Sequence, residues 1–358
     1  MDIRSMTDDL ATLVAVESPS TDDRALAASA QVVAALGTRL LGSAPGRHGH
    51  HLIWRHGPTQ VLLLGHHDTV WPVGTIDRWP FTVDGDRATG PGCFDMKAGL
   101  VQLFHALGTR PSLDGITVIV NADEEIGSTT SRGLIHDAAA GARAALVCEP
   151  SSTGGALKTA RKGIGRYRVE VTGRAAHAGL EPHLGVNAAV ELAHQTLAAA
   201  ALGLGDTTVT PTLTTAGTSD NTVPAGAAMT IDMRGFDPAE FDRVERALHG
   251  LRPVLPGAAI TVTGGVSRPP MPPGTSAGLH RLAHRAAARL GQPAPPGVAV
   301  GGASDGNLTA AQGVPTLDGL GAIGGNAHAE GEWVDLAAMP GRAALLAALI
   351  SETFGASS

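Results

Sequence analysis

The segment Gly65-His66-His67-Asp68-Thr69-Val70 directly follows the apolar run Val61-Leu62-Leu63-Leu64, and Gly90-Pro91-Gly92-Cys93-Phe94-Asp95-Met96-Lys97 follows further along the chain. A His and an Asp two residues apart at the end of a strand, with a second Asp after a Gly/Pro turn, indicate half of a metal site. In open α/β sheets, ligands gather at the carboxyl ends of the strands. The stretch therefore predicts a parallel sheet with a metal site at one edge.

Three later segments supply the other half of this predicted site. The apolar run Val118-Ile119-Val120 leads into Asp123-Glu124-Glu125-Ile126-Gly127, and Ala145-Leu146-Val147-Cys148 leads into Glu149-Pro150. His328 follows in a glycine-rich loop. Each polar group comes after an apolar run, so we expect these side chains at strand ends beside His66.

Composition excludes several classes of protein. The chain has 358 residues, of which 43% are hydrophobic, enough for two packed domains. Its net charge is -7, only 16% of its residues are charged, and it has no basic cluster, so we expect neither nucleic acid nor a membrane as a partner. No run reaches the roughly 18 to 20 apolar residues that span a bilayer, and no secretory signal precedes the first helix, so we expect a cytoplasmic protein. The two cysteines, Cys93 and Cys148, are expected as buried thiols.

Periodicity predicts alternating helices and strands in the first part of the chain, and hence an α/β fold with a mostly parallel sheet covered by helices. We expect helices over 8–16, 22–40, 98–107 and 131–140, and strands over 61–64, 116–120 and 144–148.

After Glu149 the pattern changes to the order β-α-β-β-α-β, which is typical of an open-faced, ferredoxin-like α+β sandwich. Strands are expected over 166–172, 208–215, 227–234 and 258–263, and helices over 185–201 and 238–251. We therefore expect a catalytic metal-binding domain formed by residues 1–162 and 269–358. Residues 163–268 would be an inserted lid and dimerisation domain, and a cleft is expected where two such domains meet.

The donor set suits a pair of divalent ions sharing one carboxylate. Imidazole and carboxylate are both good zinc ligands, and a catalytic site leaves a position for water. We assign His66 and Glu149 to one metal and Glu125 and His328 to the other, with Asp95 bridging. Zinc is the expected metal, with cobalt or manganese as alternatives.

Two acidic residues of this set are expected not to bind metal. Asp68 would orient His66 and fix its tautomer. Glu124 would take a proton from water and hand it to the leaving nitrogen. His67 should face away, because alternate strand residues point to opposite sides. An isolated HxD pair is more typical of a capped strand end, and it is the joint occurrence of these motifs that favours the metal site.

The chain resembles the dinuclear zinc exopeptidases and deacylases that include glutamate carboxypeptidase, acetylornithine deacetylase, succinyl-diaminopimelate desuccinylase and aminoacylase. The resemblance is carried by GHHDTVWPVGT (65–75), GPGCFDMKAG (90–99), DEEIGS (123–128), CEP (148–150), GRAAHAG (173–179), NTVPA (221–225) and HAEGEWVD (328–335). It looks closest to the bacterial glutamate carboxypeptidase branch. It implies the metal and base roles given above, a homodimer formed through the inserted domain, and a cis peptide after Asp95.

The resemblance also assigns work to the inserted domain. His177 matches a histidine that crosses from the partner subunit to polarise the scissile carbonyl, and Asn221 and Arg234 match residues that grip the substrate carboxylate. The loop that contains Gly302 and Ser304 is expected to bind the same end of the substrate through backbone N–H groups and a hydroxyl.

These motifs lead to a predicted metal-dependent amidohydrolase that cleaves the amide bond to an amino acid with a free carboxylate, such as a dipeptide, with a glutamate-releasing carboxypeptidase in first place. The alternative enzyme is an N-acyl-amino-acid deacylase similar to acetylornithine deacetylase. A non-enzymatic alternative is a metal-binding protein of the same fold that has lost turnover. The presence of Glu124 beside five candidate ligands argues against it.

Overall fold

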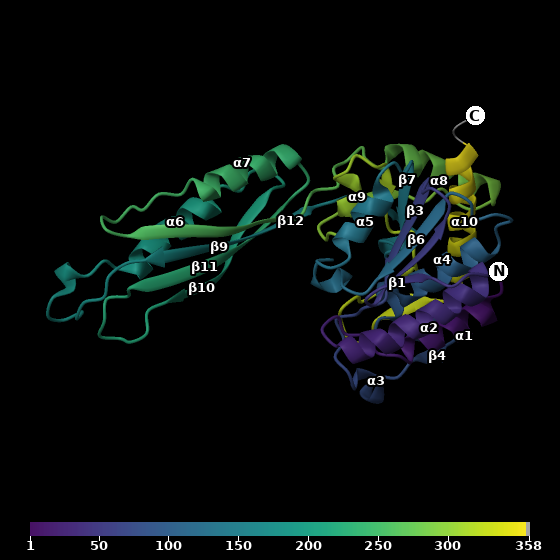
Figure 1. Cartoon of the computed structure of the whole chain (residues 1–358), viewed down its shortest axis with the longest axis horizontal. Helices are drawn as coiled ribbons and strands as arrows, with labels where there is room; N and C mark the ends of the chain where they lie inside the picture. Colours follow the sequence, from purple (N-terminus) through teal and green to yellow (C-terminus); the bar gives the residue numbers. More distant parts are fainter. Residues whose placement is uncertain (356–358) are drawn as a thin grey trace. The chain divides into compact units, whose positions relative to one another are not determined.

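The computed structural model describes residues 1–355, which form two compact units (Figure 1). The first unit contains Met1–Ala160, Pro273–Val300 and the segment that begins at Ser304. The second contains Arg161–Pro272 and the short segment Gly301–Ala303. The Arg161 guanidinium donates hydrogen bonds to the carbonyls of Gly302 and Ala303, which explains why this segment belongs to the second unit.

The first unit is built on a six-stranded sheet with the order β1-β2-β6-β3-β7-β14. The pairs β3/β6, β3/β7 and β7/β14 are parallel, as the alternation of helices and strands predicted. At one edge, β1 and β2 form a hairpin that was not predicted, and β2 pairs antiparallel with β6. The strands are β1 (Gly46–His48), β2 (His51–His56), β3 (Val61–His66), β6 (Ile116–Asn121), β7 (Ala144–Val147) and β14 (Thr316–Leu317).

Helices cover both faces of this sheet. Successive residues of β3 show it, because Leu63 packs into one core cluster while Leu62 and Leu64 pack into another. The larger cluster contains side chains of α1 (Ile3–Val14), α2 (Asp23–Leu41), α4 (Ala98–Gly108), α8 (Ala277–Arg289) and α10 (Met339–Gly355). The smaller contains side chains of α5 (Arg132–Ala139) and α9 (Gly306–Ala310).

The first helix begins earlier than the sequence predicted. Helix α1 starts at Ile3 and not at Asp8, because the Asp2 carboxylate accepts hydrogen bonds from the backbone N–H groups of Arg4 and Ser5. Such a cap satisfies donors that a helix N-terminus otherwise leaves free.

Short strands hold the loops at the carboxyl edge of the main sheet. A four-stranded antiparallel sheet has the order β15-β16-β5-β4 and consists of β4 (Thr82–Asp84), β5 (Arg87–Thr89), β15 (Gly324–Gly325) and β16 (Trp333–Asp335). A two-stranded sheet pairs β8 (Leu157–Arg161) with β13 (Gly297–Val300), and the short helix α3 covers Thr75–Arg78. The pairing of β5 with β16 places the loop of Asp95 beside the loop of His328.

The second unit has the predicted β-α-β-β-α-β order. Its sheet is antiparallel with the order β10-β11-β9-β12, and α6 and α7 pack on one face (Figure 1). Its elements are β9 (Gly163–Thr172), α6 (Ala188–Ala200), β10 (Thr208–Ala216), β11 (Gly226–Gly235), α7 (Pro238–His249) and β12 (Ala259–Arg268). The predicted α/β fold with an inserted open-faced sandwich is thus confirmed. Among the described residues no helix is long and apolar enough to cross a membrane.

Candidate metal centre

The carboxyl ends of three parallel strands carry predicted site residues. His66 is the last residue of β3, a short helical turn (Glu124–Ile126) follows β6, and Glu149 follows β7. In the parallel register His66 lies beside Asn121, the last residue of β6. The strands end level with one another, which brings the side chains after them to one edge of the sheet.

Asp95 lies between two pairs of side chains. Its Oδ1 is 3.4 Å from His66 Nε2, which is also 3.4 Å from Glu149 Oε1. Its Oδ2 is 3.3 Å from His328 Nε2, which is 3.2 Å from Glu125 Oε2. The structure therefore brings all five predicted ligands together, with one oxygen of Asp95 facing each pair.

This donor set fits divalent metal ions. Among the described residues, the buried atoms Asp95 Oδ1 and Glu125 Oε1 have no hydrogen-bond partner, although buried carboxylate oxygens are normally satisfied. Two ligands of one tetrahedral ion at about 2.1 Å stand about 3.4 Å apart, close to the separations around Asp95. Within the described part of the chain, two sets have ligand atoms within 4.8 Å of one another, namely His66 with Asp95 and Glu125, and His66 with Glu124 and Glu149. The second set places Glu124 close enough to act on the same site.

Asp68 makes hydrogen bonds to His66 and to the turn that contains Glu124 and Glu125. His66 Nδ1 is 3.0 Å from the backbone oxygen of Asp68, a contact that requires the proton on Nδ1 and leaves the Nε2 lone pair for a metal. The Asp68 carboxylate also accepts hydrogen bonds from the backbone N–H groups of Glu124 and Glu125, at 3.2 and 3.1 Å. Ser20 donates a further hydrogen bond to it at 2.7 Å. Asp68 thereby holds the Glu124 turn against His66.

The imidazoles and carboxylates of the cluster shift one another's pKa values. Contacts with Asp95 and Glu125 raise the pKa of His328 to about 10. Burial alone would lower the pKa of His66, but contacts with Asp68, Asp95 and Glu149 raise it well above its ordinary value. Against the effect of burial, His328 and His66 hold the pKa of Asp95 well below its usual range. A metal ion at these nitrogens would need the deprotonated imidazoles, so metal binding is expected to depend on pH.

Two local predictions near the cluster are confirmed. The Asp95–Met96 peptide bond is cis, as the family resemblance implied. The His67 ring points away from the cluster, with Nδ1 at 3.0 Å from Ser29 Oγ and Nε2 at 3.1 Å from the backbone oxygen of His50. Cys93 and Cys148 are buried free thiols, and burial raises the pKa of both.

In the second unit, His177 and Asn221 lie together on neighbouring loops. His177 forms an isolated bridge with Thr222, and the backbone N–H of Ala178 donates to the Asn221 carbonyl at 2.9 Å. Arg234 lies at the opposite end of β11, where its guanidinium makes two hydrogen bonds to Asp232 at 2.8 and 3.1 Å. The structure does not bring Asn221 and Arg234 of one chain together.

The Ser304 hydroxyl is bound by neighbours within the first unit. The Ser304 side chain is fully buried, and its hydroxyl donates to Asp318 Oδ2 at 2.5 Å and accepts from the backbone N–H of Gly306 at 3.1 Å. Ser304 therefore holds the loop in shape, and a contact of its hydroxyl with substrate stays a prediction. Gly302 is exposed, and a role for its backbone stays a prediction.

Glu332, which was not predicted from the sequence, is a buried acid four residues after His328, and its carboxylate binds the Asp95 loop. Glu17 was not predicted either, and its carboxylate accepts from the backbone N–H groups of Gly74 and Ile76. Glu332 lies within the HAEGEWVD motif, but no spacing rule distinguishes a buried acid there from the exposed Glu330.

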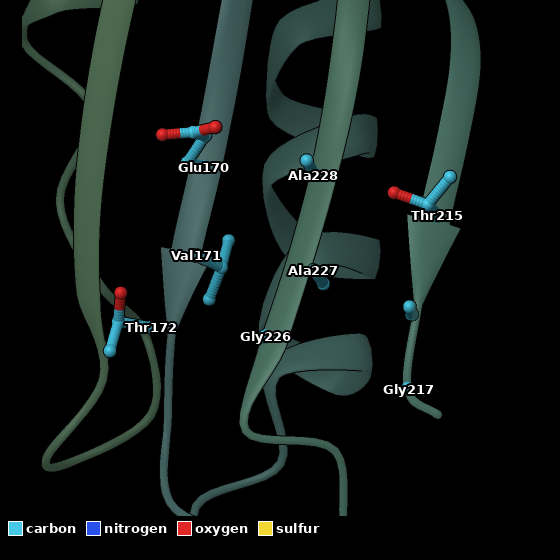
Figure 2. A pocket seen from close by; sticks show the side chains of 9 residues that line it. Glu170, Val171, Thr172, Thr215, Gly217, Gly226, Ala227 and Ala228 are labelled. Carbon is cyan, nitrogen blue, oxygen red and sulfur yellow. The ribbon is translucent and has the colours of Figure 1, made fainter. Parts of the chain in front are cut away.

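A shallow pocket of about 320 Å³ on the sheet of the second unit has a different character (Figure 2). Glu170, Thr172 and Thr215 border it, and Ala228 and Gly226 of β11 lie between them. Its lining contains one carboxylate and no imidazole, thiol or basic side chain, so it offers neither a metal-binding set nor a nucleophile paired with a base. The pocket therefore lacks the catalytic groups that the cluster around Asp95 contains.

Comparison with known proteins gives one consistent result. Residues 62–352 match the model of peptidase family M20/M25/M40. Carboxypeptidase G2 from Pseudomonas sp. (strain RS-16) is 34% identical over 334 residues, which are 88% of this chain and 77% of that enzyme. Acetylornithine deacetylase from Myxococcus xanthus is 26% identical over 214 residues, 56% of each chain.

Solved structures share the fold over nearly the whole chain. The aminopeptidase PepT from Bacillus cereus has a TM-score of 0.77 at 22% identity, with 99% of both chains covered. The M20 family metallo-carboxypeptidase Sso-CP2 from Sulfolobus solfataricus has a TM-score of 0.72 at 17% identity, again with 99% of both chains covered. At such identities these likenesses establish the fold alone.

Proposed function

The chain belongs to peptidase family M20/M25/M40, and on that premise we propose that it is a two-metal carboxypeptidase that hydrolyses the amide bond to a C-terminal amino acid, with glutamate as the leading residue. The observation that carries the proposal is the position of Asp95, whose two oxygens face His66 and His328 separately. One ion would be held by His66 and Glu149, the other by Glu125 and His328, and Asp95 would bridge them. Zinc suits this set of ligands.

Bound divalent ions would supply Lewis-acid polarisation of the substrate carbonyl and a lowered pKa for the attacking water. Glu124 would act as the general base and then as the general acid. Its turn is fixed by Asp68, and its carboxylate lies near His66 and Glu149. It accepts the proton of the attacking water and delivers it to the leaving nitrogen.

His177 has the tautomer that an oxyanion donor needs. Its Nδ1 accepts hydrogen bonds from the backbone N–H groups of Gly179 and Leu180, at 3.1 and 3.2 Å. An accepting Nδ1 leaves the proton of the neutral ring on Nε2. The side chain is exposed, so this Nε2–H is free to donate to the oxygen of a polarised carbonyl.

The placement of Asn221 and Arg234 supports a dimeric site. Strand β11 runs from Gly226 to Gly235, and eight residue steps of strand span about 26 Å. A small substrate cannot reach both ends of this strand. We therefore assign Arg234 of one subunit and Asn221 with His177 of the other to one active site.

The second unit also carries surface suited to a dimer contact. Strand β10 is an edge strand of its sheet, and Leu213 on it is 69% exposed. Leu197 on α6 is 73% exposed. Exposed edge strands pair readily with another chain, and exposed apolar side chains beside them favour burial. We propose that two copies of the protein associate through β10 and α6.

A substrate panel tests the proposed function. Metal-free protein should be inactive, and about two equivalents of zinc per chain should restore hydrolysis of N-acyl glutamates and dipeptides with C-terminal glutamate. Each substrate is compared with its α-carboxamide, which keeps the scissile bond but lacks the free α-carboxylate of the C-terminal residue. Hydrolysis of N-acetylornithine in preference to all glutamate compounds would favour the deacylase alternative, which the similarity to acetylornithine deacetylase supports. Absence of turnover on every substrate with zinc, cobalt and manganese would contradict both enzymes.

Replacement of Arg234 by methionine should raise KM with little change in kcat. A guanidinium binds a carboxylate through charge-assisted hydrogen bonds of about 1.5 to 3 kcal/mol, so we expect a rise in KM of about 10- to 100-fold. Because Asp232 holds this guanidinium, Asp232→Asn should cause a smaller rise. The carboxamide of the same substrate should be hydrolysed equally by wild type and variant. A similar loss on the carboxamide would contradict a contact between Arg234 and the carboxylate.

A further inference from the structure

Glu332 is a buried carboxylate that collects four N–H groups. Its Oε1 accepts from the backbone N–H groups of Phe94 and Asp95, at 2.7 and 2.8 Å. Its Oε2 accepts from the backbone N–H of Gly92 and from Trp71 Nε1, both at 3.0 Å. Glu332 is 1% exposed. Every one of these donors belongs to a segment that carries the predicted metal site.

The backbone of Glu332 makes further contacts with the same loop. Its carbonyl accepts from the backbone N–H of Gly90 at 3.4 Å and from Cys93 Sγ at 3.6 Å. The side chain and the backbone carbonyl of Glu332 together bind the turn from Gly90 to Asp95. The backbone N–H of Asp95 itself donates to Glu332, so the orientation of the Asp95 backbone depends on this acid.

Glu332 also anchors the loop that carries His328. It lies four residues after that histidine and directly before β16, and its backbone N–H donates to the carbonyl of Ala329 at 3.1 Å. Glu332 therefore connects the backbone of Asp95 with the loop of His328. Asp95 Oδ2 and His328 Nε2 are 3.3 Å apart.

We propose that Glu332 is a positioning residue that sets the separation of Asp95 and His328, and that its loss weakens metal binding at the Glu125–His328 position more than at the His66–Glu149 position. This inference rests on the proposed two-metal function. It concerns a residue that touches neither metal nor substrate and acts through the loops of two ligands.

The difference between the two positions follows from how their histidines are held. His66 is 1% exposed at the end of a central strand, and Asp68 fixes its ring. The His328 side chain is 49% exposed, and its loop contains two residues with positive φ, Asn326 and His328 itself. Residues with positive φ persist only where the surrounding structure holds them, so the anchor at Glu332 matters more to this exposed loop.

Glu332→Gln tests the inference, because the amide keeps the shape of the side chain but points an N–H₂ group at N–H donors. Metal-free protein is titrated with Co²⁺ and followed by visible absorption and by metal analysis after gel filtration. Wild type should bind two ions per chain. The variant should bind one ion normally and the second about 10- to 100-fold more weakly, in line with the loss of an outer partner of a metal ligand. Trp71→Phe removes one of the four donors and should shift the second affinity in the same direction by less.

Two carboxylates serve as matched controls. Glu330→Gln changes an exposed acid in the same loop. Glu17→Gln removes a carboxylate that also accepts from two backbone N–H groups, at 2.8 and 2.9 Å, but on a turn without a metal ligand. Both should bind two Co²⁺ ions as wild type does, even if Glu17→Gln lowers the melting temperature. A general loss of stability would affect Glu17→Gln and Glu332→Gln alike.

The outcomes separate this inference from the proposed function. Wild type that binds fewer than two Co²⁺ ions would overturn the two-metal proposal itself. Wild type that binds two, with Glu332→Gln and Trp71→Phe binding both ions at unchanged affinity, would overturn only the role of Glu332. An equal loss at both positions, or the same loss in Glu17→Gln, would also overturn it.

Discussion

Replacement of Glu124 by glutamine is expected to lower kcat by at least about 10²- to 10⁴-fold while the protein keeps its metal ions. The variant keeps the size of the side chain and removes the group that accepts a proton. The Asp68 carboxylate holds the backbone N–H groups of Glu124 and Glu125, so the turn should keep its shape. Steady-state kinetics and metal analysis of the same preparation provide the measurement.

Glu125→Gln is the matched control, because the two acids are adjacent and equally charged. Glu125 Oε2 lies 3.2 Å from His328 Nε2, so its loss should reduce metal content together with activity. Glu124 is also close to His66 and Glu149, which means that the structure alone permits it to bind metal. Metal loss in Glu124→Gln would therefore make Glu124 a ligand, and near-normal turnover would remove it from the mechanism.

The sequence predicted the part of the site that follows long buried strands. His66 is the last residue of β3, and Glu125 and Glu149 follow β6 and β7. The apolar runs of these strands are uninterrupted or nearly so because both faces of the sheet are covered. In such strands the end of the apolar run marks the end of the strand, so the position of the next polar residue can be deduced. The inserted domain was predictable for a similar reason, since its half-exposed strands alternate clearly.

The parts that were missed depend on contacts between distant segments. The sheet that joins the loops of Asp95 and His328 is made of strands of only two or three residues, which leave no periodic pattern. The Ser304 hydroxyl donates to Asp318, and nothing local to its loop reveals that partner. Glu332 differs from Glu330 only by facing the Gly90–Asp95 turn, which is more than 200 residues earlier in the chain.

His177→Ala should be nearly inactive alone and should regain activity when mixed with Glu124→Gln. Loss of one oxyanion donor is expected to lower kcat by about 10²- to 10³-fold. If His177 serves the site of the partner, each mixed dimer contains one site that combines an intact Glu124 from one subunit with an intact His177 from the other. Random exchange should then restore about a quarter of wild-type activity, because half of the dimers are mixed and each has one complete site.

Exchange must be measured in the same sample, for example by co-purification of two affinity tags, and a mixture of Glu124→Gln with Glu125→Gln serves as control. Those two acids lie on one turn of the same subunit. Every subunit of this mixture therefore lacks one of them, no site in a mixed dimer is complete, and no activity should return. His177 is held by Gly179 and Leu180 of its own loop, so its replacement should not disturb the fold of the second unit. If exchange is complete and mixing restores nothing, or if an active monomer is isolated, His177 acts within its own chain or not at all. Recovery in the first mixture alone would mean that the inserted domain of each subunit completes the active site of the other.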